Sequence, residues 1–350
     1  MAEEEQAFVN TRPIVHIKGI KRDEFDETVM NMMVNLPLNG MSHAEIKLSN
    51  WGMQSGMTNS DFLLLDIKLG DDLEIYLGEK NPVRIFFGEI TAIEEIYGDG
   101  SPQLVLLMQD KLHRLARIRK SRSFENATID SIVSQLAGEV SLQSDVNITT
   151  LSGTFHQVNE SNLAFLLRLL APLDIAMRLD EDKLRVRDEE GDRNPFKLDA
   201  QDNANNVRLL VDLNHQPTVG KVMGFNPANN SSVSGSNKAL SPSPAFKTAS
   251  DHLKALSWKG DDNFPQPFPQ TQASADAYAL GQFKKRAKRF INGDIRCRGE
   301  ASLKSGREIE LVGVSERLKG KYQVVNCIHS FNGTDGYETR LKVNRADWNV

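Results

Sequence analysis

The sequence predicts a mainly β protein with an α/β insert between two antiparallel β regions. From residue 13 to about 118, apolar and charged residues alternate with a period of two, which is typical of half-buried strands. The pattern changes to that of helices between about 119 and 200, and strand patterns return between 201 and 350. A chain of 350 residues is long enough for these regions to form separate domains.

The first β region consists of short runs separated by turn signals. Its alternating apolar positions are Ala44, Ile46 and Leu48, then Leu73, Ile75 and Leu77, then Val83, Ile85 and Phe87. Residues 69–72, 79–82 and 97–100 are rich in Gly, Asp, Asn and Pro, which favour turns. Residues 104–108 are apolar throughout, as expected of a strand covered on both faces. This region therefore fits an antiparallel barrel or sandwich.

The middle region contains two predicted helices and a hairpin. Residues 129–137 carry an amphipathic stripe, with Thr128 as the expected N-cap and Gly138 near the C-terminal end. A second helix is predicted from near Asn159, apolar on both faces and therefore buried, until Pro172 ends it. Residues 175–179 and 184–187 flank a turn and predict a small hairpin.

The last region begins with strands at 207–213 and 219–225. Residues 226–272 are rich in Ser, Asn and Pro, which predicts a long mobile surface loop with little regular structure. A helix follows, with Ala275, Ala279, Phe283 and Ala287 on its apolar side and five cations between Lys284 and Arg289 on the other. This basic face could contact DNA, an acidic partner or solvent, and a partner or solvent is favoured because clustered cations would hold DNA rather than let it slide.

The terminal strands repeat the pattern of the first β region. Residues 69–78, Phe87 with Gly88, and 103–107 have counterparts in 304–313, Lys319 with Gly320, and 337–343. In both series a glycine precedes each strand and a glycine-containing hairpin returns the chain, because tight turns use positive φ. The pattern suggests an internal duplication, although part of it is common to hairpins in general. A trimer of a duplicated chain would present six similar units around one axis.

Composition and charge exclude several classes of protein. The net charge is -5, so the chain has no overall electrostatic signature of nucleic acid or membrane binding. Residues 1–12 form an acidic tail that we expect to be flexible, without the features of a signal peptide, and no apolar run is long enough to span a membrane. Cys297 and Cys327 are predicted to be small core residues in a reducing compartment. Synthesis in the cytoplasm is therefore expected.

Sequence motifs predict no catalytic, cofactor-binding or metal-binding residues. The seven histidines lack ligand spacing relative to carboxylates or cysteines. Glu94 and Glu95 are adjacent on a predicted strand and would point to opposite faces, so they cannot flank one glycosidic bond. Residues 233–238 lack the glycine spacing of a phosphate-binding loop. The chain is therefore predicted not to be an enzyme and to use no cofactor.

The same stretches resemble the phage late control gene D family of baseplate hub proteins, which is related to the hub part of type VI secretion spike proteins. The segments that carry the resemblance are 86–90, 104–108, 110–115, 127–133, 159–166, 320–325 with His329 and Phe331, and 336–339. Each segment is short, but their order along the chain is specific. The resemblance covers most of the sequence.

The resemblance implies a homotrimer in which two tube-like β-barrels per chain form a pseudo-hexameric ring. Its domains would be a first barrel at 13–118, an α/β domain at 119–200 outside the ring, and a second barrel at 201–350 that carries the loop at about 226–272. The ring would join a hexameric tail tube protein to a separate trimeric spike protein, beside other baseplate proteins and without sequence-specific nucleic acid binding. After synthesis the protein would become part of a virion tail or injection particle baseplate.

Two alternatives stay open at this stage. The protein could instead be a cell-wall or glycan-binding module, or a hydrolase, at the tail tip. That function would require an aromatic-lined groove or a carboxylate pair, and the aromatic content of 7% is ordinary. The particle itself could be a phage, a tailocin or another injection system.

Overall fold

The computed structural model describes residues 11–53, 59–78, 81–98, 100–148, 151–180, 182–188, 194–237, 240, 246–258, 261–265 and 267–349. Strands dominate this part of the chain, as the sequence predicts. Residues 1–10, most of the predicted N-terminal tail, lie outside it. Thr11 is buried, and the guanidinium of Arg12 donates to the carbonyl of Asp26 at 2.7 Å.

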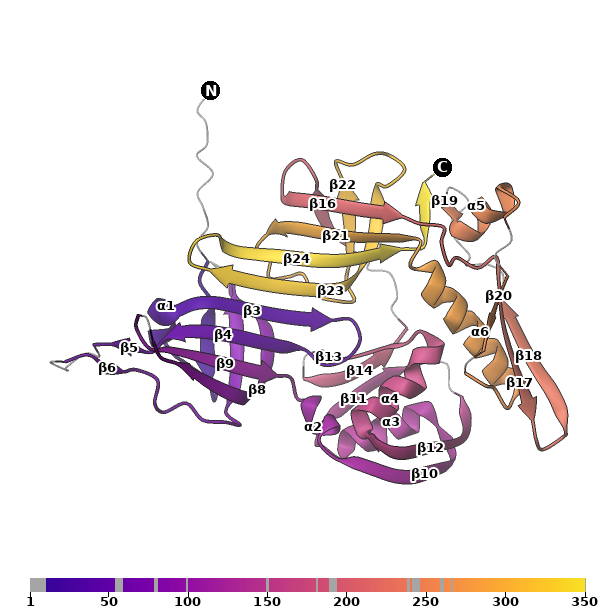
Figure 1. The fold of residues 1–350 in the computed structure, drawn as a ribbon, viewed down its shortest axis with the longest axis horizontal. Helices are drawn as coiled ribbons and strands as arrows, with labels where there is room; N and C mark the ends of the chain where they lie inside the picture. Colours follow the sequence, from indigo (N-terminus) through magenta and orange to yellow (C-terminus); the bar gives the residue numbers. More distant parts are fainter. Residues whose placement is uncertain are drawn as a thin grey trace.

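One sheet runs through both β regions of the chain (Figure 1). Its main path is β16–β21–β24–β23–β3–β4–β9–β8–β7–β1–β2, and β22 and β15 branch from β23. The strands of the first half are β1 (Ile14–Ile17), β2 (Ile20–Lys21), β3 (Val29–Pro37), β4 (His43–Ser49), β7 (Asp72–Leu77), β8 (Val83–Ile96) and β9 (Gln103–Gln109). Those of the second half are β15 (Phe196–Asp199), β16 (Ala204–Val211), β21 (Ile291–Arg298), β22 (Glu308–Val312), β23 (Gly320–Asn332) and β24 (Gly336–Arg345).

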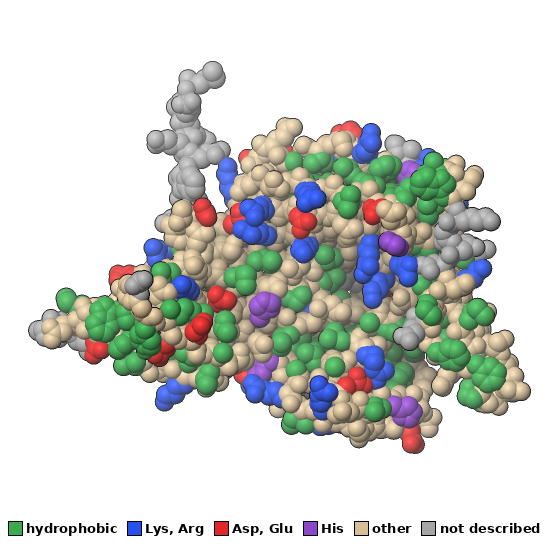
Figure 2. Space-filling model, in the orientation of Figure 1, with side chains coloured by type: hydrophobic (Ala, Val, Ile, Leu, Met, Phe, Trp, Pro, Cys, Tyr) green, Lys and Arg blue, Asp and Glu red, His purple; other side chains and the backbone are tan. Residues whose placement is uncertain are grey.

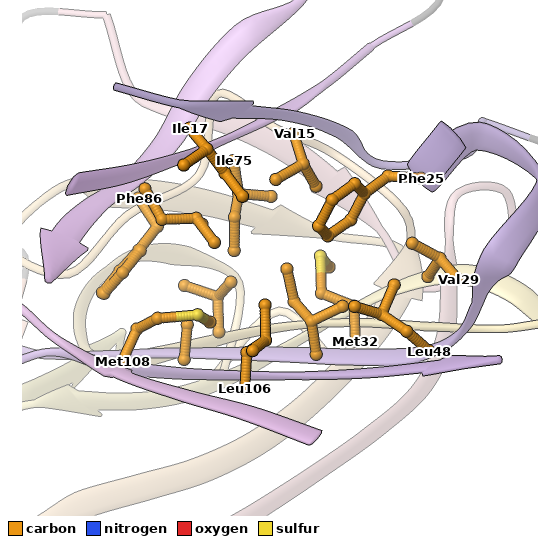
Figure 3. Close-up of a cluster of buried hydrophobic side chains, with 14 of the residues drawn as sticks. Val15, Ile17, Phe25, Val29, Met32, Leu48, Ile75, Phe86, Leu106 and Met108 are labelled. Carbon is orange, nitrogen blue, oxygen red and sulfur yellow. The ribbon is translucent and has the colours of Figure 1, made fainter. Parts of the chain in front are cut away.

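Each half encloses its own core. In the first half, β1 and β7 lie opposite β3, β4 and β9, and the short helix α1 (Glu24–Thr28) covers one end with Phe25. Figure 3 shows Val15, Ile17 and Ile75 on one side of this core and Met32, Leu106 and Met108 on the other. The predicted alternation at positions 44–48 and 73–77 is confirmed, because the apolar members of each run are buried.

The second half has a separate core between β16, β21 to β24 and β15. Cys297 and Cys327 are free and buried in it, which confirms the prediction that they are core residues. The strand pairings of the described residues form an open path, so they do not close either half into a barrel. Barrel closure remains a prediction.

The two halves have the same strand order over five strands. The series β3–β4–β9–β8–β7 corresponds to β16–β21–β24–β23–β22, with antiparallel neighbours throughout. Bulges occur at equivalent places. One falls between Val29 and Asn31 in β3 and between Ala204 and Asn206 in β16. The other falls between Ile90 and Ala92 in β8 and between Val324 and Asn326 in β23.

The turns that lead into β7 and β22 also match. The amide of Gly70 donates to the carbonyl of Ile90 at 2.8 Å, and the amide of Gly306 donates to that of Val324 at 2.8 Å. Both glycines have positive φ, 85° and 83°. This agreement supports the duplication suggested by the sequence and corrects its alignment: the bulges place Gly320 level with Phe86, two residues from Gly88.

The halves differ beyond these five strands. β1 runs antiparallel to β7, whereas β15 runs parallel to β22. The short strands β5 (Trp51–Gly52) and β6 (Asp61–Phe62) pair with each other at the far end of the first half.

The middle of the chain forms an α/β module with its own core. It contains β10 (Arg119–Thr128), α3 (Ile129–Gly138), β11 (Gln143–Asn147), β12 (Ser152–Ser161), α4 (Asn162–Leu170), a 3₁₀ turn at Ala171–Leu173, β13 (Ala176–Asp180) and β14 (Lys183–Arg187). The first predicted helix and its Thr128 cap are confirmed, as is the hairpin of β13 and β14. The short helix α2 (His113–Ala116) joins this module to the first half.

The second predicted helix begins three residues later than expected. β12 continues past Asn159, which has a φ of 48°, and the side chain of Ser161 caps α4 by accepting from the amide of Ala164. The helix ends at Leu170, before Pro172 in the 3₁₀ turn. Phe165, Leu166 and Leu170 are fully buried, which confirms the prediction of a buried helix.

The expectation of a long loop at 226–272 is wrong for much of that range. It contains β18 (Ser231–Asn237), β19 (Phe246–Thr248), α5 (Ala249–Ala255) and β20 (Asp261–Phe264), and β18 and β20 flank β17 (Val219–Asn226). The small residues serve packing: a Cβ at Gly235 would lie 2.1 Å from the carbonyl oxygen of Ala275 in α6 (Gln272–Ala287). Residues 241–245, which include the Ser-Pro repeat, lie outside the described residues.

Candidate functional site

The two halves are joined by direct pairing of β3 with β23. Seven residue pairs form this joint, from Asn31 opposite Asn332 to Pro37 opposite Asn326. Val34 lies opposite His329, Met32 lies opposite Phe331, and all four are buried. The joint is therefore part of the continuous sheet and is expected to be rigid.

His329 is fully buried at this joint. One ring nitrogen, Nδ1, lies 2.7 Å from the hydroxyl of Tyr337, and Nε2 lies 3.0 Å from the carbonyl oxygen of Leu303. Burial lowers the pKa of His329 to about 4, because the charged imidazolium would lose its hydration. The ring is thus neutral near pH 7 and has a structural role.

Two strand edges of the main sheet lack a partner among the described residues. β16 pairs with β21 along one edge only. β8 pairs with β7 through residues 83–89, so on that side its continuation to Ile96 is unpaired. Large apolar side chains are exposed at both edges, including Leu210 (59%) and Tyr97 (60%). Edges of this kind are templates for pairing with another chain.

An aromatic cluster lies beside the open edge of β8. The ring of Phe62 contacts Trp51 and Tyr97 edge to face, at centroid distances of 5.2 and 6.3 Å. Figure 2 shows hydrophobic side chains gathered at this end of the molecule, where Figure 1 places β5 and β6. Rings that meet edge to face do not form a flat platform of the kind that would stack on a sugar.

A cleft of about 500 Å³ lies where the middle module meets both halves. Its lining comes from β8, from the β13–β14 hairpin and from residues 301–305. Asp180 receives hydrogen bonds from Lys304 at 2.7 Å and Arg185 at 2.8 Å, and its pKa is lowered by these cations against the raising effect of its burial. Arg84 of β8 bridges to Asp182 at 3.0 Å. These ion pairs connect the hairpin to both halves.

The segment at 110–115, which carries part of the family resemblance, forms the connection from β9 into the middle module. Asp110 is buried and accepts from the amides of Ser42 at 2.7 Å and Leu112 at 3.0 Å. Burial raises the pKa of Asp110 to about 6. His113 and Arg114 both contact Glu89 of β8. These contacts hold the connection in place and indicate a structural role for the motif.

The basic face of α6 lies partly against the middle module, which the sequence did not predict. Lys284 pairs with Asp188 at 2.7 Å and Lys288 pairs with Asp174 at 2.7 Å. Gly281 allows the close approach, because a Cβ there would lie 2.5 Å from the carbonyl oxygen of Pro172. Lys285 and Arg289 line a second hollow of about 180 Å³, and Figure 2 shows Lys and Arg side chains gathered in this area.

The residues considered for chemistry are dispersed. Glu94 and Glu95 lie near the end of β8 and are both exposed, and Tyr97 contacts Glu95 through its hydroxyl. Residues 233–237 lie within β18, in a strand instead of a loop before a helix. In the described ranges, no three His, Cys, Asp or Glu side chains are placed to share a metal ion. None of the helices that the structure describes could span a membrane.

Two solved structures with a similar fold are described as tail proteins. The 43 kDa tail protein of prophage MuSo2 from Shewanella oneidensis aligns with a TM-score of 0.70 over 96% of this chain and 98% of its own, at 11% identity. A tail protein from Neisseria meningitidis MC58 aligns with a TM-score of 0.69 over 96% of both chains, at 11% identity. The chain therefore has the fold of these tail proteins.

A third similar structure is the E. coli c3393 protein, described as a component of the type VI secretion system that is similar in structure to the T4 tail proteins gp27 and gp5. It aligns with a TM-score of 0.61 over 94% of this chain and 76% of its own, at 13% identity. Comparison with curated protein sequences gave no match.

A family model described as the Alg8 N-terminal domain matches residues 14–333. The match covers most of the chain, so the chain belongs to this family. This is not the late control gene D family that the sequence resembles. The similarity to that family remains a resemblance.

Proposed function

We propose that the chain is a structural hub subunit of a contractile tail or related injection apparatus. The observation that carries the proposal is the duplication, in which two five-strand series share their order, their bulges and the glycine turns before β7 and β22. The fold shared with tail proteins and with a type VI secretion component points the same way.

A duplicated chain can connect a structure with six-fold symmetry to one with three-fold symmetry. Three copies would place six similar halves around one axis, so a hexameric tube could dock on one side and a separate trimeric spike on the other. The resemblance to late control gene D hub proteins supports this arrangement, with a tube-like barrel at 13–118 and another at 201–350. The α/β domain at 119–200 would lie outside the ring, among other baseplate proteins.

A hub subunit acts by fitting and binding other subunits, so we propose that the protein has no enzymatic activity and requires no cofactor. The ionisable groups that are buried support this view, because they hold segments of the chain together. Asp110 accepts backbone amides, and Asp180 binds Lys304 and Arg185. The protein would be made in the cytoplasm and then become part of the particle.

Light scattering of the purified protein, coupled to size exclusion, tests the proposal. We expect a species of three times the 39.1 kDa chain mass, and binding to the tube protein and the spike protein of the same particle. A protein that stays monomeric at high concentration and binds neither partner would refute the proposed function. Incubation with peptidoglycan should release no fragments, and cleavage would instead support a hydrolase at the tail tip.

A further inference from the structure

We infer that β16 of one copy pairs antiparallel with the open edge of β8 in the next copy, in the register that β3 adopts with β23 inside each chain. The inference rests on the proposed self-assembly and names the surfaces that carry it. The partner is a second copy of this chain.

The duplication defines which residues are equivalent. The bulges align Val29 with Ala204 in β3 and β16, and Ile90 with Val324 in β8 and β23. Within the chain, β3 of the first half pairs with β23 of the second half. The equivalent contact joins β16 of a second half to β8 of a first half, and among the residues that the structure describes no strand pairs with either of these edges.

The register follows from the same equivalence. The pairs with side chains facing the core are Val211 with Ile93, Leu209 with Glu95, and Val207 with Tyr97; the pairs on the other face are Leu210 with Glu94 and Arg208 with Ile96. No two like charges are directly opposite, and Arg208 lies diagonal to Glu94 on one face. Opposite charges at such positions stabilise paired strands.

Side chains at the β3–β23 joint are buried, whereas the equivalent side chains at the open edges of β8 and β16 are more exposed. Phe331 is 2% exposed where it lies opposite Met32 of β3, whereas its equivalent Tyr97 is 60% exposed. His329 is fully buried, whereas its equivalent Glu95 is exposed. On the other strand, Val34 is fully buried and its equivalent Leu209 is half-buried. A strand from a second copy would cover these side chains as β3 covers theirs.

The contact is head to tail, because it joins two different surfaces of the chain: β16 at one end of the strand path, and the part of β8 that extends beyond its pairing with β7. Each copy therefore offers one edge of each kind, and a head-to-tail contact produces a closed ring when its rotation closes. In Figure 1 the strands from β16 to β8 lie side by side as two consecutive groups of four, β16–β21–β24–β23 and β3–β4–β9–β8. The new joint would continue this sequence of strands from one copy to the next.

Engineered disulfides test the register. In the pair Arg208→Cys with Ile96→Cys, the two cysteines lie opposite each other only across the proposed joint, so oxidation should link copies into covalent trimers on non-reducing gels. The matched reference is Met33→Cys with Ser330→Cys, the equivalent pair within one chain, which should lose its free thiols without a change in mass. The negative control, Val207→Cys with Ile96→Cys, places the thiols on opposite faces and should not link. Both native cysteines are buried.

A charge reversal gives a second test. Leu210→Glu would place a carboxylate opposite Glu94 and should weaken association about tenfold or more when summed over the joints of a ring. Adding Glu94→Lys should restore association to within about threefold of the original protein. Exposed Leu210 and Glu94 make few internal contacts, so both variants should fold.

The outcomes separate this inference from the proposed function. A trimer by light scattering in which Arg208→Cys with Ile96→Cys stays unlinked, while the intrachain reference oxidises, would refute the joint and leave the hub proposal intact. A protein that is monomeric throughout, and binds neither tube nor spike, would refute both. Covalent trimers from the opposed pair, together with rescue by Glu94→Lys, would support the joint.

Discussion

Replacing the two equivalent glycines with alanine should give unequal losses of stability. Gly70 and Gly306 occupy the same place in the two halves and have nearly the same positive φ, 85° and 83°. A Cβ at position 70 would meet no heavy atom within 4 Å, whereas a Cβ at position 306 would lie 2.3 Å from Nη2 of Arg178. The pair therefore separates backbone strain from a steric clash.

The expected magnitudes follow from these two terms. An L-residue in the left-handed region costs about 1–2 kcal/mol, which is the whole expected effect of Gly70→Ala. In Gly306→Ala the end of Arg178 must also move. Arg178 is buried but lines the cleft between the middle module and the two halves, so it can shift to a poorer rotamer at a cost of about 0.5–1.5 kcal/mol. We expect Gly306→Ala to lose about 2–3 kcal/mol in all.

Hydrogen exchange at the two turns measures both losses. The amides of Ile90 and Val324 bond to the turn residues Asp71 and Arg307, so their opening free energies report on the two sites. In the Arg178→Met background the extra loss from Gly306→Ala should disappear and match that of Gly70→Ala. Equal losses in the original background, or an extra loss that persists without Arg178, would refute the reasoning.

Three further predictions concern other parts of the chain. Hydrogen bonds from Arg122, above all, lower the pKa of Glu139 from 4.5 to about 2. The contribution of Glu139 to the free energy of unfolding should therefore be present above pH 4.5 and be lost as the pH falls toward 2. Glu139→Gln should cost about 1–3 kcal/mol at pH 7 in urea unfolding and flatten this dependence; a dependence that is unchanged would contradict the assignment. Burial lowers the pKa of His329 from 6.5 to about 4. Its contribution to the free energy of unfolding should therefore be full above pH 6.5 and decline by about 3 kcal/mol as the pH drops to 4. His329→Gln should remove that decline when the urea midpoints are compared across this pH range. Gly281→Ala should destabilise the contact of α6 with the middle module by more than about 2 kcal/mol, measured by exchange in α6, whereas Gly138→Ala, which has open space around its Cβ, should be neutral or slightly stabilising; similar effects would show that α6 is not closely packed there.

Local elements were predicted well where the pattern of apolar residues is strong. The helix at 129–138 follows its stripe and its Thr128 cap, and the alternation at 44–48 and 73–77 gives strands with the expected faces buried. The start of α4 was misplaced because Asn159 adopts a positive φ inside a strand, and one residue type cannot reveal that conformation.

The stretch at 226–272 was misread because its composition, rich in Ser, Asn and Pro, resembles that of a loop. Small residues in β18 instead let α6 approach its backbone, and this contact requires a helix that begins about 40 residues later in the chain. The pairing of Lys284 and Lys288 with Asp188 and Asp174 was invisible for the same reason, since the partners are about 100 residues apart.

By itself the sequence determined the mainly β character, the position of the α/β insert, the burial of both cysteines and the suggestion of a repeat. These features depend on local periodicity and composition, which the order of residues records directly. Only the tertiary structure decided how the repeat is built, because strand neighbours, bulge positions and the pairing of β3 with β23 join residues about 300 positions apart. The open edges of β8 and β16 could be recognised only once the equivalent closed joint was seen, since an edge is defined by the partner it lacks.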